Sequence, residues 1–167
     1  MLELNQKVSY GTTGVCVVEG IEEKKIGREL KRYYVLKPVS QATSTVFLPA
    51  DNEKLLLKVR KVLTADEVKD IISASKNEPD IWPENDAERK IAFNGIITSG
   101  DRKACLVMMR SLQNRQDVLS SNGKRLHIAD ERALKEAQRL VHDEFSVALD
   151  MRTDEIGSYL KTEMCIK

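Results

Sequence analysis

The feature that most constrains the fold is a change of hydrophobic period near residue 63. Before it, short runs rich in Val, Ile and Tyr are separated by Gly, Asn and Pro, which predicts β-strands. After it, apolar residues recur at intervals of three and four, which predicts helices. Strands followed by helices are typical of the α+β class. We therefore predict two domains, residues 1–62 and residues 63–167.

The first domain is predicted to be a small antiparallel β-barrel of five short strands, a fold that hides strand edges. Gly20 lies where a strand would bend or bulge, and Pro49 would end the fourth strand. The segment from Gly11 to Gly14 superficially suggests a phosphate cradle, but it lacks the following Lys-Ser/Thr and helix, so a turn is predicted. The predicted strands are residues 7–10, 14–22, 32–36, 44–48 and 59–62.

The second domain is predicted to be a compact all-α unit of about five helices. Thr64 and Glu67 predict a capping box, Pro83 suits a first helical turn, and Asp101 can cap a third helix. The longest helix is predicted from about residue 127 to 149, and a last one follows Thr153. Predicted core positions include Ile91, Ile96, Ile97, Cys105, Met108, Met109, Leu112, Leu134, Ala137, Val141, Phe145, Ala148, Ile156, Leu160 and Met164.

The distribution of charge along the chain is more informative than the net charge. With 27 Lys plus Arg against 26 Asp plus Glu, the formal charge is +1, which excludes a protein coated in positive charge. Residues 1–62 carry +4 and residues 63–167 carry −3, yet residues 89–125 alone carry +6. Such a segment can neutralise a row of phosphates. Alternatively, some of these cations pair with the acidic last helices.

The sequence contains few residues of the types that catalysis or metal binding usually requires. His127 and His142 are the two histidines, and neither has a second ligand at a metal-binding spacing. Cys16, Cys105 and Cys165 form no Cys-x-x-Cys pair, which fits reduced thiols, and the first two lie among apolar neighbours typical of a core. We predict no enzyme activity, cofactor or metal, although a site assembled from distant residues stays open. No signal peptide or membrane span is evident, so a cytoplasmic protein without membrane contact is expected.

Trp82, the only tryptophan, lies in a polar, Pro-flanked junction. Its ring could pack against its own domain. An exposed ring beside a basic segment could instead enter a minor groove or stack on an unpaired base. The residues alone leave both interpretations open.

The order of several short motifs resembles the CarD/CdnL family of bacterial transcription regulators along nearly the whole chain. In the first half the motifs lie at residues 7–10, 14–15, 19–22, 33–36 and 45–49, and this half is also similar to the polymerase-interacting module of the transcription-repair coupling factor. In the second half they are Trp82 and residues 89–90, 99–101, 109–112 and 137–144.

The resemblance implies a regulator that stabilises the open promoter complex. It implies that a Tudor-like, SH3-like barrel binds the RNA polymerase β subunit, and that the helical domain contacts promoter DNA at the upstream edge of the bubble. Contacts to the minor groove and phosphate backbone imply little sequence specificity, and the polymerase would bring the protein, expected to be a monomer, to the nucleoid. The implied polymerase-binding residues are Lys24, Val46, Phe47 and Pro49, and the implied DNA-binding residues are Trp82, Arg89, Lys90, Lys124 and Arg125.

This chain departs from the family pattern at several places. Lys24 and Phe47 stand where better-known members have arginines, so the polymerase surface could differ in geometry. His127 stands where a Ser helix cap is usual, and the chain is a few residues longer between Trp82 and Ser99, which makes the assignment of Arg89 and Lys90 approximate. The alternative function is a protein–protein adaptor that links RNA polymerase to a second protein without contacting DNA.

Overall fold

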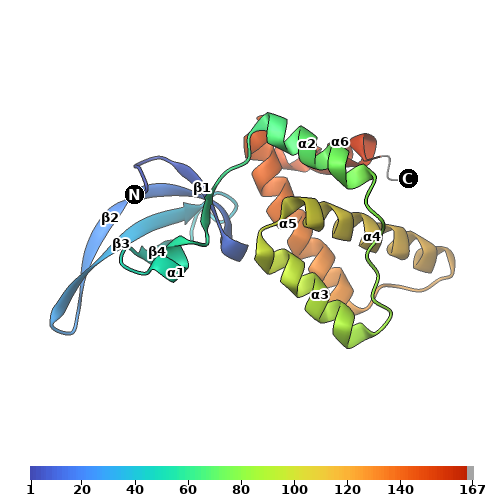
Figure 1. The fold of residues 1–167 in the computed structure, drawn as a ribbon, viewed down its shortest axis with the longest axis horizontal. Coiled ribbons are helices and arrows are strands. Elements are labelled where there is room, and N and C mark those ends of the chain that lie inside the picture. The colour runs from blue at the N-terminus through green and yellow to red at the C-terminus, as the bar shows by residue number, and fades with distance from the viewer. Residues whose placement is uncertain (165–167) are drawn as a thin grey trace. The chain divides into compact units, whose positions relative to one another are not determined.

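The chain folds as two compact units, Met1–Val62 and Leu63–Lys167. The computed structural model describes residues 1–164, so Cys165 lies outside the described residues. Figure 1 shows strands in the first unit and a group of helices in the second. The prediction of an α+β chain, with strands preceding helices, is confirmed.

The first unit is a five-stranded antiparallel sheet with strand order β4-β3-β2-β1-β5, which confirms the predicted strand number and direction. β4 and β5 are the two ends of this hydrogen-bonded order. A short helix, α1 (Glu53–Leu56), which the sequence pattern did not predict, follows β4. The strands are β1 (Lys7–Tyr10), β2 (Gly14–Ile26), β3 (Glu29–Pro38), β4 (Val46–Pro49) and β5 (Val59–Lys61).

Alternating side chains of the sheet build a small core. Val8, Val18 and Leu36 are buried in it together with Cys16, Tyr34 and Leu48. Burial raises the pKa of the Cys16 thiol to about 11, because a thiolate is poorly solvated there. The interpretation of Cys16 as a core residue is therefore confirmed.

The hairpin of β2 and β3 is longer than predicted and extends beyond the other strands (Figure 1). Its outer part was missed because it has no core beneath it and therefore lacks a clear apolar alternation. Gly27, with φ of 65°, makes the turn at a backbone angle that favours glycine. Nearer the core, the pairing register shifts between Val18 and Gly20, which confirms the predicted irregularity at Gly20.

Within residues 63–164, the second unit contains five helices: α2 (Ala65–Lys76), α3 (Asp86–Ser99), α4 (Arg102–Ser121), α5 (Ile128–Leu149) and α6 (Thr153–Glu163). The capping box of Thr64 and Glu67 and the cap by Asp101 are both present, as predicted. α4 and α5 pack against each other, and α2 and α3 pack against both. Their shared core includes Phe93, Cys105, Leu106, Met108, Leu112, Leu140, Phe145 and Ile156.

Two local predictions in this unit are wrong. Pro83 does not begin a helix, because the Asn85 side chain accepts hydrogen bonds from the backbone N–H groups of Ala87 and Glu88 and so starts α3 at Asp86. Ile91 is not a core residue and is 74% exposed. The buried stripe of α3 is Arg89, Phe93 and Ile97 at intervals of four. It contains a charged residue, which a pattern of apolar residues does not reveal.

Candidate protein and nucleic-acid interfaces

The first candidate surface lies on β4, at one end of the sheet. Phe47 is 39% exposed, and the Lys24 Nζ lies 3.0 Å from the centroid of its ring, a cation–π contact. Lys24 and Phe47, which were predicted separately, are thus brought together. Pro49 is two residues from Phe47, and a strand's side chains alternate, so Phe47 and Pro49 lie on one face. We call Lys24, Phe47 and Pro49 the β4 face.

Val46 differs from the other three predicted polymerase-binding residues. It is half-buried and packs against the core of the first unit, as alternation along β4 requires. An open hollow of about 510 Å³ lies next to Pro49 and is also lined by Tyr33, Lys31 and Lys54. The β4 face therefore combines an exposed aromatic ring, a cation and the end strand of a sheet, features suited to a protein partner.

The second candidate surface is centred on Trp82, in the segment between α2 and α3. The ring is half-buried and meets the buried ring of Phe93 edge to face, with centroids 6.3 Å apart and an interplanar angle of 61°. Two guanidinium groups also lie over the ring: the Cζ of Arg89 is 4.4 Å from its centroid and that of Arg115 is 5.2 Å. Trp82 therefore packs on its own unit while keeping part of its surface exposed.

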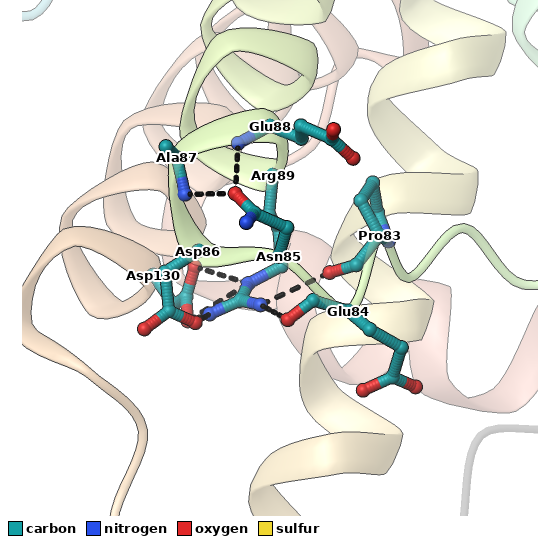
Figure 2. Close-up of polar contacts among 8 residues, drawn as sticks. All are labelled: Pro83, Glu84, Asn85, Asp86, Ala87, Glu88, Arg89 and Asp130. Carbon is teal, nitrogen blue, oxygen red and sulfur yellow. Dashed lines mark hydrogen bonds and ion pairs between the residues drawn. The ribbon is translucent and has the colours of Figure 1, made fainter.

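Arg89 is a buried anchor of this segment. Only 3% of the residue is exposed, and its Nε and Nη2 donate to the Asp130 carboxylate of α5 at 3.0 and 2.9 Å. Nη1 donates to the Pro83 carbonyl at 3.0 Å, and Nη2 also donates to Asp86 at 2.7 Å (Figure 2). The hydrogen bonds to Asp130 are the main reason that the pKa of Arg89 is raised. Its donors are thus used within the protein, which does not fit the predicted phosphate contact.

A second anchor holds the same segment from α4. Arg110 Nε donates to Asp80 at 2.8 Å, and Asn114 Nδ2 donates to the other Asp80 oxygen at 2.9 Å. Desolvation alone would raise the pKa of Asp80, but these hydrogen bonds lower it below its ordinary value. The Ser111 hydroxyl accepts from the Ile81 backbone N–H at 2.8 Å. The backbone is therefore fixed immediately before and after Trp82.

The basic segment from residue 89 to 125 divides into paired and exposed cations. Arg89 and Arg102 pair with Asp130 and Glu144 of α5, as the alternative interpretation of the charge pattern required. Lys103 and Arg110 pair with Glu78 and Asp80. The exposed cations are Lys90, Arg115, Lys124 and Arg125.

Three of the predicted DNA-binding cations are thus accessible. Lys90 lies on α3, and Lys124 and Arg125 lie in the connection between α4 and α5. Arg115 was not predicted as a site residue, although it belongs to the basic segment, because nothing in the sequence indicates that α4 brings it to Trp82. His127 precedes α5 and its side chain makes no capping hydrogen bond.

Comparison with known proteins identifies the first unit. Residues 2–63 match the sequence model of the CarD-like/TRCF RID domain. The first unit therefore belongs to the CarD-like/TRCF RID domain family. A search of curated proteins finds no match to the chain. CarD-like proteins are non-enzymatic transcription factors, and the RID match suggests an interaction with RNA polymerase and a role in transcription.

Two further observations concern residues 1–164. None of their helices is long and apolar enough to cross a membrane. Within the same residues, no group of three or more His, Cys, Asp and Glu side chains is placed to hold a metal ion.

Proposed function

We propose that this protein binds the RNA polymerase β subunit through the β4 face and stabilises the open promoter complex through the second unit. The RID match supports the polymerase contact. The observation that carries the DNA contact is the partly exposed Trp82 ring, held on a segment anchored on both sides and accompanied by the exposed cation of Arg115. A fixed aromatic ring beside positive charge suits a distorted or partly melted duplex.

In the proposed mechanism, Trp82 enters the minor groove at the upstream edge of the bubble and hinders its collapse. Unstacking a base step costs a few kcal/mol, so the ring acts on DNA that the polymerase has already distorted. Lys90, Lys124 and Arg125 contact backbone phosphates, which adds affinity without sequence specificity. Arg89 takes a different role from the predicted one: it holds the segment that presents the ring.

The test is the lifetime of open promoter complexes with the unsubstituted protein and with Trp82→Ala. We expect Trp82→Ala to lose most of the increase in lifetime while still co-purifying with RNA polymerase. Trp82→Phe, which keeps an aromatic ring, should retain part of the effect, and thermal unfolding of each variant controls for stability. Lifetimes unchanged by Trp82→Ala would show that the ring is not a wedge.

The adaptor function is a second candidate, favoured by one observation. Ile91 on α3 and Ile128 at the start of α5 are 74% and 69% exposed and so offer apolar contact area to a protein partner. Footprinting of a promoter complex separates the two functions. Protection at the upstream edge of the bubble that depends on Trp82 supports DNA contact, and an unaltered footprint supports the adaptor.

A further inference from the structure

The two guanidinium groups over the Trp82 ring differ in their freedom to move. Arg89 is buried and bound to Asp130, Asp86 and backbone carbonyls. Arg115 is exposed on α4, and within residues 1–164 the Trp82 ring is the interaction partner that the structure gives its side chain. The nearby carboxylate of Asp117 accepts a hydrogen bond from Gln113. Arg115 therefore carries a charge that no carboxylate of the described chain pairs with.

The backbone of Arg115 is nevertheless held firmly relative to the Trp82 ring. The preceding residues of α4 fix the Trp82 segment, since Ser111 accepts from the Ile81 N–H and Asn114 donates to Asp80. Arg115 follows Asn114 directly. Its backbone thus moves together with the Trp82 segment, while the restraint that residues 1–164 place on its side chain is the contact with the ring.

We propose that Arg115 is a phosphate ligand of the DNA site and covers the Trp82 ring until DNA binds. This inference rests on the proposed function. An exposed cation–π contact is weak, whereas a guanidinium can bind a phosphate through two charge-assisted hydrogen bonds. As the ring approaches the groove, Arg115 leaves the ring and binds a neighbouring backbone phosphate. Arg89 stays in place because its donors are already used by the protein.

The test uses the full chain and a forked DNA with one duplex arm and two unpaired arms. Because Trp82 is the only tryptophan, its fluorescence emission reports on this ring alone. Affinity is measured at several KCl concentrations for the unsubstituted protein, Arg115→Gln and Arg115→Lys. Losing one phosphate contact should reduce the slope of log affinity against log salt by about 0.7–0.9.

The matched control is Arg152→Gln, which removes the same charge at the start of α6. Arg152 lies beyond the carboxyl end of α5, whereas Asp130, the partner of Arg89, lies near its amino end. An α-helix rises about 1.5 Å per residue, so α5 places the control far from the ring. The ion pair of Arg152 with Asp154 is exposed, so its loss should leave the fold intact.

We expect Arg115→Gln to reduce the salt slope and the change in Trp82 emission on DNA binding, and Arg115→Lys to keep the slope. Arg152→Gln should change neither quantity. A slope for Arg115→Gln equal to that of the unsubstituted protein would overturn the inference, and so would a failure of the unsubstituted protein to bind the fork. The proposed function is judged separately, by the open-complex lifetime with and without Trp82→Ala.

Discussion

At the scale of single residues, the buried pair of Arg89 and Asp130 joins α3 to α5 and the Trp82 segment. Removing one partner of such a pair leaves an uncompensated charge, which typically costs about 3–5 kcal/mol. Asp130→Asn should therefore lower the free energy of unfolding by about that amount in urea denaturation. Asp86→Asn alters the exposed carboxylate on the same guanidinium and should cost far less. Equal losses for the two variants would show that burial of the pair does not determine its contribution.

Burial of His142 determines how this residue makes the stability of the fold depend on pH. Burial lowers the pKa of His142 below 6.5, and the nearby charge of Asp143 only partly opposes this. The unfolded chain then binds a proton more readily than the folded one. The contribution of His142 to stability is therefore fully present above the unfolded pKa of about 6.5, and it is lost as the pH falls from there through the lowered pKa of the folded state. Urea unfolding at pH 7.5 and 5.5 should show a smaller loss of stability in His142→Gln than in the unsubstituted protein. An identical loss in both would contradict the prediction.

At the scale of elements, alanine substitutions at Gly95, inside α3, and at Gly100, the C-cap of that helix, are expected to have opposite effects on stability. Gly95 lies inside the helix, and an added Cβ would meet no atom within 4 Å, so Gly95→Ala should raise the free energy of unfolding by about 0.5–1 kcal/mol. Gly100 ends the helix in the left-handed conformation, with φ of 76°. Gly100→Ala should lower stability by about 1–2 kcal/mol. Thermal or urea unfolding of the two variants checks both signs.

The elements also show what the sequence could and could not predict. The caps by Thr64 and Asp101 were predictable because the interacting groups lie within three residues of each other. The ends of β2 and β3 were not, because the outer hairpin buries no apolar face. The Trp82 site depends on contacts between residues 30 to 41 positions apart, such as Arg110 with Asp80 and Arg89 with Asp130. No local pattern encodes those pairings, so the sequence predicts neither the buried pair of Arg89 nor the approach of Arg115 to Trp82.

At the scale of the whole molecule, a net charge of +1 gives little general attraction to DNA. The four exposed cations of the second unit's basic segment provide local charge, while the other four cations of that segment are paired within the protein. Binding to polymerase can act as a tether and compensate for this weak attraction to DNA, because it raises the effective concentration of the second unit at the promoter. The two units should then have separable effects on promoter complexes.

This separation can be measured by recording the open-complex lifetime at increasing concentrations of the protein. Phe47→Asp removes the exposed ring of the β4 face and places a carboxylate near Lys24, so it should weaken the tether. We expect the protein concentration needed for half of the maximal effect to rise at least tenfold, a change of about 1.4 kcal/mol, with the maximal lifetime unchanged. Trp82→Ala should do the reverse and lower the maximal lifetime without shifting that concentration.

The matched control is Leu30→Asp, which puts the same charge on an exposed apolar position of β3. Leu30 is 70% exposed and, by strand alternation, lies on the opposite face of the sheet from Val35, the residue paired with Phe47. If Leu30→Asp leaves the titration unchanged, a shift in Phe47→Asp reports on the β4 face and not on added negative charge. Equal shifts in the two variants, or a lowered maximum in Phe47→Asp, would mean that the first unit does more than tether the second.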